Sequence, residues 1–174
     1  MSEAKLARKT TETDISLKLK LDGSGISKIS TGVGFFDHML ELFAKHGFFD
    51  LELNCVGDLN VDCHHSIEDI GIVLGSAVKE ALGDKAQITR YSSIYLPMDE
   101  SLALVVMDIS GRNYLYYDVP VSNENVGEFK SEMAEEFFYA FCSNAAIGSA
   151  ISGVSPPKRD FDCVIMVIRF LVSL

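Results

Sequence analysis

Apolar and polar residues alternate along several short stretches of this chain of 174 residues, a pattern typical of strands with one buried face. The clearest stretch is 15–21, where every second residue is apolar. The sequence Asp-Gly-Ser-Gly at 22–25 predicts a hairpin turn that leads into a return strand at 26–30. The stretch 102–107 is almost continuously apolar, which predicts a strand buried on both faces. The same patterns predict further strands at 48–54, 91–96, 102–109, 114–119 and 147–154.

Apolar residues three and four positions apart predict helices at 36–46, 63–82 and 131–144. Gly47 and Gly83 follow the first two helices and are expected to end them. The second helix is the longest, and its first turns carry two adjacent histidines and a glutamate.

The order of these elements suggests two halves of similar plan, although no close sequence repeat accompanies it. A helix, a strand and a second helix between 36 and 82 are matched by a helix, a strand and an apolar segment between 131 and 173. That last segment is rich in β-branched residues, which leaves strand and helix both open. We expect an α+β fold of two duplicated sheet-plus-helix halves, residues 1–90 and 91–174, in one compact unit with helices packed on one face of each sheet.

Composition narrows the class of protein. Apolar residues make up 48% of the chain and charged residues 23%, so a sizeable core is expected. The net charge of −10 argues against nucleic-acid binding, although a local basic pocket for a phosphorylated small molecule remains open. The four cysteines lack a CxxC spacing, which favours free thiols. A polar N-terminus and the lack of a long apolar run predict a soluble, cytoplasmic protein without a membrane span.

The candidate chemistry centres on His64, His65 and Glu68, which open the second predicted helix. Residues three and four apart share a helix face, so two imidazoles and a carboxylate can converge on a divalent metal. The alternative is a pair of solvated histidines beside a surface glutamate. All four histidines lie between His38 and His65, and this clustering favours the metal site. Imidazole and carboxylate ligands suit manganese, iron or zinc.

Two arginines are candidate phosphate ligands. Arg90 and Arg112 each lie at a strand boundary, where a planar guanidinium can bind phosphate with two hydrogen bonds, although ordinary surface arginines are the alternative. The chain has no dinucleotide loop, no Walker sequence and no nucleophile elbow.

Six segments together resemble one known family, the imidazoleglycerol-phosphate dehydratases of histidine biosynthesis. They are RKTTET (8–13), TGVGFFDHML (31–40), DCHHSIED (62–69), PMDE (97–100), DISGR (108–112) and EEFF (135–138). The resemblance implies the duplicated fold of the second domain of ribosomal protein S5. It also implies a homo-oligomeric shell of 24 subunits with two manganese ions in each site between subunits.

The resemblance further implies roles for individual residues. His38, His64, His65 and Glu68 match metal positions, and Glu136 lies where many members carry a further histidine ligand. Glu12 and Glu68 are the implied catalytic residues. The implied contacts to a phosphorylated imidazole substrate are Glu12, His38, His46, His64, His65, Glu68, Arg90 and Arg112.

The resemblance ends after Ile147. The family carries a second HHxxE segment and a phosphate-binding lysine further on, whereas this chain has Asp160, Phe161, Val164 and Ile168 at those positions. Phenylalanine and valine cannot bind a metal. We therefore expect weak manganese binding and impaired or absent dehydration of imidazole glycerol phosphate to imidazole acetol phosphate. A non-catalytic assembly subunit or a degenerate copy of the enzyme is the alternative.

Overall fold

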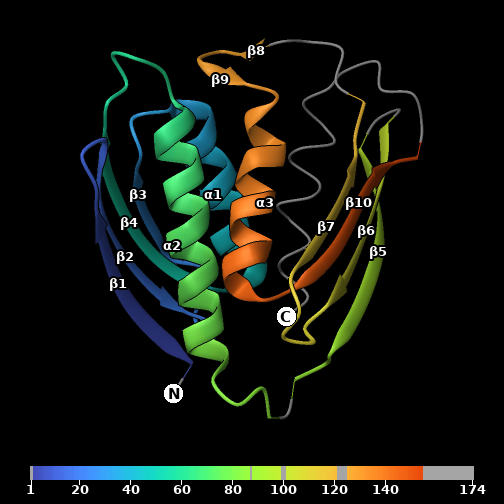
Figure 1. The fold of residues 1–174 in the computed structure, drawn as a ribbon. Helices are drawn as coiled ribbons and strands as arrows, with labels where there is room; N and C mark the ends of the chain where they lie inside the picture. Colours follow the sequence, from blue (N-terminus) through green and yellow to red (C-terminus); the bar gives the residue numbers. More distant parts are fainter. Residues whose placement is uncertain (1, 87, 99–100, 121–124, 155–174) are drawn as a thin grey trace.

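The computed structural model describes residues 2–86, 88–98, 101–120 and 125–154. Two four-stranded sheets form the outer layers, and the helices lie between them (Figure 1). The predicted α+β class with two sheet-plus-helix halves is confirmed. The apolar segment 161–173 and the positions of Asp160, Phe161, Val164 and Ile168 lie outside the described residues.

The first sheet has the strand order β1-β2-β4-β3 and is covered on its inner face by helices α1 and α2. Its elements are β1 (Glu3–Lys9), β2 (Thr13–Lys20), β3 (Ser27–Ser30), α1 (Gly34–Gly47), β4 (Asp50–Gly57) and α2 (His64–Leu82). Both predicted helices and the strands at 15–21 and 48–54 are therefore confirmed. The sequence patterns missed β1, in which only Ala4 is fully buried.

The predicted hairpin between 15–21 and 26–30 is wrong. β2 pairs antiparallel with β4, and β3 pairs parallel with the other edge of β4. Leu53 of β4 lies opposite both Leu17 and Ile29, so the apolar centre of β4 separates the two strands. The chain does turn after β2, where Gly25 has a positive φ of 83°, but this turn leads to an edge strand beyond β4 and not to a hairpin.

The second sheet repeats the plan with the order β5-β6-β10-β7. Its elements are β5 (Tyr91–Met98), β6 (Ser101–Asp108), β7 (Tyr114–Asp118), α3 (Met133–Ala145) and β10 (Gly148–Gly153), with a small β8 (Asn125–Val126) and β9 (Phe129–Lys130) pair before α3. The expectation that β6 is buried on both faces is wrong. Its residues alternate in burial, and Val106 is 39% exposed, because helices cover only the inner face of the sheet.

Helices α2 and α3 pack closely and run in the same direction (Figure 1). A Cβ atom on Gly71 would lie 2.8 Å from the Phe137 carbonyl oxygen, and one on Gly75 would lie 2.4 Å from that of Phe141. Glycine is therefore required at these two positions for the backbones to approach. This packing brings the first turns of both helices to the same end of the molecule. No helix in the described part of the chain is long and apolar enough to cross a bilayer.

Candidate functional site

The first turn of α2 carries His64 and Glu68 on one face. His64 Nε2 lies 3.8 Å from Glu68 Oε2, and both side chains are between 40 and 50% exposed, at 41% and 47%. The His64 backbone N–H donates a 2.8 Å hydrogen bond to Asp62 Oδ1, which closes a turn just before the helix. The predicted one-turn spacing thus brings an imidazole and a carboxylate together at the surface.

His65 points elsewhere, toward a residue that the sequence patterns missed. Its Nδ1 lies 3.0 Å and 3.2 Å from the two carboxylate oxygens of Asp58, in the turn after β4. This hydrogen bond to Asp58 is the main reason that the pKa of His65 is raised. The predicted convergence of His64, His65 and Glu68 on one point is therefore only partly met within one chain. No periodic signal links positions 58 and 65, because only the fold of the loop brings them together.

Glu12 lies in the turn between β1 and β2, near the His65 ring. The Thr11 hydroxyl donates a 2.7 Å hydrogen bond to Glu12 Oε1. The pKa of Glu12 is lowered by the hydroxyls of Thr11 and Thr10 and, to a smaller degree, by the charge of His65. Glu12 is therefore placed as an ionised carboxylate at the same end of the molecule as the α2 histidines.

A buried carboxylate anchors the turn that carries Glu12. Asp69 Oδ1 accepts a 2.8 Å hydrogen bond from Arg8 Nε, and its Oδ2 accepts a 2.5 Å hydrogen bond from the Thr13 hydroxyl. The Thr10 hydroxyl in turn accepts hydrogen bonds from the backbone N–H groups of Glu12 and Thr13. Asp69 thus connects α2 to both ends of the Glu12 turn, a role with no local sequence signal.

His38 and Glu136 occupy matching places in the two halves. Phe48 and Ala146 end α1 and α3 with the same positive φ of 55°, and each N–H bonds to the carbonyl four residues earlier. Counting ten residues back from each of these two caps reaches His38 and Glu136. His38 is exposed on the second turn of α1, whose preceding loop packs against the loop before α2 where Gly32 faces Leu59.

His46 lies at the opposite end of the first half. It belongs to the last turn of α1, about 12 Å along the helix axis from His38 at roughly 1.5 Å per residue. β4 then runs from this end to the loop before α2, a length of about 26 Å for its strand of 8 residues. One chain therefore does not bring His46 to His64 and His65.

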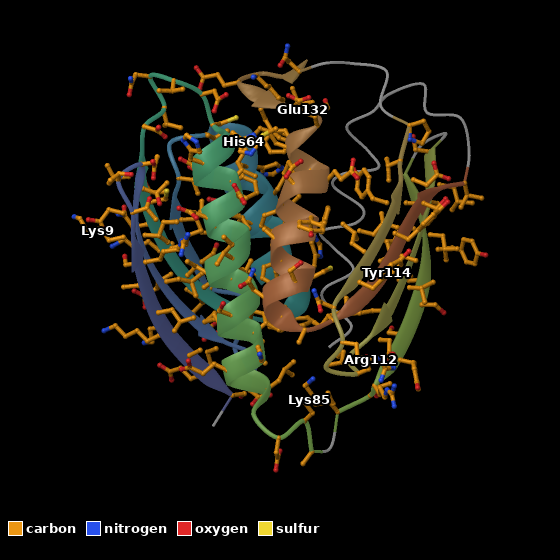
Figure 2. All side chains as sticks on the ribbon, in the orientation of Figure 1. Lys9, His64, Lys85, Arg112, Tyr114 and Glu132 are labelled. Carbon is orange, nitrogen blue, oxygen red and sulfur yellow. The ribbon has the colours of Figure 1, made fainter. Side chains whose placement is uncertain are left out.

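Arg90 and Arg112 meet on Asp108. Arg90 Nε and Nη2 donate hydrogen bonds of 2.8 Å and 3.4 Å to the two Asp108 oxygens, and Arg112 Nη2 lies 3.7 Å from Oδ2. The hydrogen bonds from Arg90 lower the pKa of Asp108 and raise that of Arg90. Figure 2 shows Arg112 far from His64, at the end of the molecule where α2 finishes. The two arginines form a basic group, but one chain does not place it beside the histidines.

The α2 donors have the chemistry of a divalent metal site, but they make only part of one. His64 and Glu68 are close enough to bind the same ion, and the Asp58 carboxylate accepts a hydrogen bond from one ring nitrogen of His65, which leaves the other nitrogen for a ligand. Within the described ranges, no three His, Cys, Asp or Glu groups lie close enough to hold a metal. A metal ion bound here would therefore need further ligands from outside the described part of one chain.

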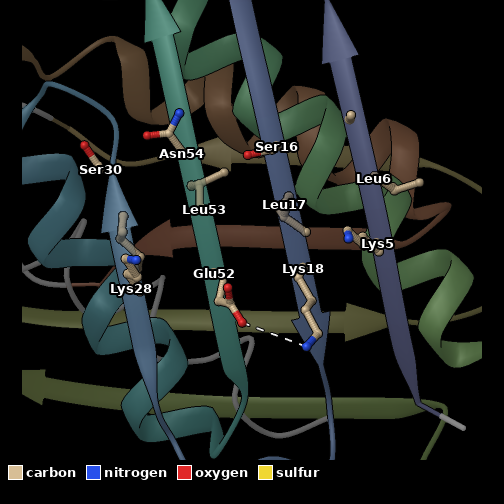
Figure 3. Close-up of a pocket in the computed structure, with 12 residues that line it drawn as sticks. Lys5, Leu6, Ser16, Leu17, Lys18, Lys28, Ser30, Glu52, Leu53 and Asn54 are labelled. Carbon is tan, nitrogen blue, oxygen red and sulfur yellow. Dashed lines mark ion pairs between the residues drawn. The ribbon is translucent and has the colours of Figure 1, made fainter.

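A separate hollow lies on the outer face of the first sheet (Figure 3). Its volume is about 610 Å³, and its lysines are Lys5, Lys18 and Lys28. Lys18 lies between two carboxylates, 3.6 Å from Glu3 and 3.9 Å from Glu52. This mixture of charges is typical of a solvated strand face, and none of the candidate residues lines the hollow.

Comparison with known proteins identifies the family of this chain. The imidazoleglycerol-phosphate dehydratase family matches residues 31–155. The chain is 58% identical over 147 residues to the imidazoleglycerol-phosphate dehydratase of Caldanaerobacter subterraneus, which covers 84% of this chain and 76% of the relative. The chain belongs to the imidazoleglycerol-phosphate dehydratase family. Its members are hydro-lyases, as the resemblance of its motifs predicted.

Further relatives agree with this assignment. The dehydratase of Acetivibrio thermocellus is also 58% identical, over 142 residues that make up 82% of this chain and 73% of the relative. The crystal structure of the Staphylococcus aureus dehydratase matches with a TM-score of 0.86 and 37% identity, over 98% of this chain and 96% of that one. The Pyrococcus furiosus structure, in complex with (S)-C348, matches with a TM-score of 0.80 and 30% identity over 94% and 87% of the two chains. The curated relatives therefore match most of the chain, and these solved structures share its fold.

Proposed function

We propose that this chain carries the chemistry of a manganese-dependent imidazoleglycerol-phosphate dehydratase, at a reduced rate. The reaction would convert imidazole glycerol phosphate to imidazole acetol phosphate in the cytoplasm, for histidine biosynthesis. The observation that carries the proposal is the grouping of His64, Glu68 and the Asp58-supported His65 beside the ionised Glu12, in a chain of this family. These are the groups that the elimination of water from an imidazole side chain requires.

The proton transfer in this reaction can be assigned to a group of this chain. The hydroxyl leaves the carbon next to the ring, and the proton leaves the neighbouring carbon, which yields an enol. That enol then takes up a proton at the carbon next to the ring and becomes the ketone. Glu12 is the carboxylate that would move the proton, since its hydrogen bonds from Thr10 and Thr11 favour the ionised form. Bound manganese would supply a Lewis acid that favours the anionic form of the imidazole ring.

The ligands for that manganese would be His64, His65, Glu68 and His38, with Glu136 as a further ligand. Glu136 is a candidate because it lies on α3 at the place that His38 has on α1. Its carboxylate oxygen is a hard ligand that suits manganese better than softer ions. Glu68 would serve as both ligand and catalytic residue.

Arg90, Arg112 and His46 would contact the substrate from a neighbouring copy. These residues lie far from His64 within one chain, so a site that contains both groups needs at least two chains. The outer face of the second sheet supports self-association, because it exposes several large side chains on one face. They are Tyr91, Tyr95, Val106, Tyr114 and Tyr116. We propose a homo-oligomer, of 24 subunits as in the family, with sites between subunits.

The reduced rate would follow from the segment 155–174. Where the family resemblance implies a second HHxxE segment, this chain has Phe161 and Val164, which have no metal-binding atom. Loss of a residue that only hydrogen-bonds to a metal ligand typically lowers activity or metal affinity by about 10–100-fold. Loss of direct ligands should therefore lower turnover by more than about 100-fold relative to an intact member.

The test is turnover of imidazole glycerol phosphate by the full chain with added manganese, measured as formation of the ketone. The Caldanaerobacter relative is the reference, and a chimera with that relative's C-terminal segment in place of 155–174 is the matched control. We expect a low rate for the chain and a restored rate for the chimera. Glu12→Gln in the chimera should lower kcat by about 10²–10⁴-fold without changing its manganese content.

Two other results would contradict parts of this proposal. A rate equal to that of the relative would show that the C-terminal segment does not limit this chain. A large particle that holds little manganese, with no turnover in the chain or in the chimera, would favour a non-catalytic assembly subunit. The partial ligand set of the described residues is the observation that favours this second candidate.

A further inference from the structure

The contact between Asp58 and His65 points to a residue that acts through the histidine. The two oxygens of Asp58 lie 3.2 Å and 3.0 Å from the same ring nitrogen, Nδ1. An ionised carboxylate only accepts hydrogen bonds, so Nδ1 must carry the hydrogen. In the neutral ring the lone pair is then on Nε2, the nitrogen that faces away from Asp58.

The turn that contains Asp58 does not require this side chain. The backbone oxygen of Asp58 accepts a 2.8 Å hydrogen bond from the Val61 N–H, which closes the turn after β4. Among the described residues, the Asp58 carboxylate bonds only to His65. A turn aspartate more often bonds to the backbone two residues on, as Asp62 does with the N–H of His64. In this loop, therefore, Asp62 bonds to the backbone of His64, whereas Asp58 bonds to the side chain of His65.

His64 supplies an internal comparison. Its Nε2 lies 3.8 Å from Glu68, beyond hydrogen-bond distance, and its ring has no carboxylate partner at Nδ1 among the described residues. The tautomer of His64 is therefore not held by the fold, whereas that of His65 is. The His65 side chain is 44% exposed, so a ligand can reach its Nε2.

We propose that Asp58 is a positioning residue that holds His65 as the Nδ1–H tautomer and so presents the Nε2 lone pair to a divalent cation. The part of this inference that concerns the cation rests on the proposed function. The part that concerns the tautomer does not, because it follows from the Asp58 contact alone. Metal-binding histidines are commonly held by a carboxylate at the other ring nitrogen, and loss of that partner typically weakens binding by about 10–100-fold.

The first experiment measures the tautomer without metal. The ring ¹⁵N shifts of His65 in the full chain, above the pH at which the ring loses its charge, should report the Nδ1–H form. The signal is assigned by its loss in His65→Gln. In Asp58→Ala the shifts should move toward a mixture of the two tautomers, and in Asp62→Ala they should not. A mixed or Nε2–H ring in the unsubstituted chain would overturn the proposal, whether or not any variant folds.

The second experiment is a titration with manganese alone. Asp58→Ala should weaken binding by about 10–100-fold, while Asp62→Ala, which removes the same charge from the same loop, should weaken it much less. Equal losses in both variants would mean that only the loop charge matters, and would overturn the positioning role. If the unsubstituted chain binds no manganese, the proposed metal function fails, and the tautomer measurement still decides the role of Asp58.

Discussion

Asp69 offers the sharpest test of how the fold holds the Glu12 turn. The Asp69 side chain is 11% exposed, and its carboxylate accepts hydrogen bonds from Arg8 and from the buried Thr13 hydroxyl. Hydrogen bonds to charged groups contribute about 1.5–3 kcal/mol each, which gives an upper range of roughly 3–6 kcal/mol for the two. The Arg8 side chain is 39% exposed, so water partly replaces its bond. Asn at position 69 also keeps one acceptor. We therefore expect Asp69→Asn to lower the free energy of unfolding by about 2–4 kcal/mol.

Urea unfolding at neutral pH measures this loss directly, and a thermal scan should show a Tm lower by roughly 5–15 °C for a domain of this size. Asp14→Asn is the matched control, because Asp14 pairs with Lys9 at the surface, where ion pairs contribute little. The energetic coupling between Asp69 and Thr13 is measured from the free energies of unfolding of Thr13→Val, of Asp69→Asn and of the double variant. If the two losses simply add, or if Asp69→Asn behaves like Asp14→Asn, Asp69 does not anchor the turn through Thr13.

Two further predictions concern the helices. Gly75→Ala should lower the free energy of unfolding by about 1–2 kcal/mol, because overpacking against the Phe141 carbonyl outweighs a gain in helix propensity of about 1 kcal/mol. Urea unfolding measures it, and Gly34→Ala, whose Cβ would have no neighbour within 4 Å, should not be destabilised. Burial raises the pKa of the Cys142 thiol from 9.0 to about 12, so the stability that the neutral thiol contributes is present below pH 9 and lost as the pH rises toward 12. Between pH 8 and 10.5 the unsubstituted chain should lose roughly 2 kcal/mol more than Cys142→Ala, and parallel slopes for the two chains would contradict the shift.

The local elements of this fold could be predicted from residue patterns. Helices α1, α2 and α3 follow apolar spacings that bury one face, and seven of the strands lie in ranges that the sequence predicts as strands. The pair His64 and Glu68 was found in the same way, since a helix of known period brings residues four apart together. Each of these features depends on residues within one turn or one strand.

Features that join distant segments required the tertiary structure. β4 lies between β2 and β3, with its buried Leu53 opposite both Leu17 and Ile29, and the turn at 22–25 carries no information about this pairing. Asp58 and Asp69 are ordinary acids in the sequence. They become specific only when a loop folds back on His65 and when β1 packs on α2.

The sequence by itself determined the family, the helices, most of the strands and the pairing of His64 with Glu68, because short-range periodicity and contiguous motifs need only neighbouring residues. Only the tertiary structure decided the strand order, the partners of the buried acids and the separation of Arg112 from His64. The physical reason is that burial and charge pairing depend on contacts between segments far apart in the chain. Local sequence preferences are compatible with many such contacts, and only packing of the core selects one set.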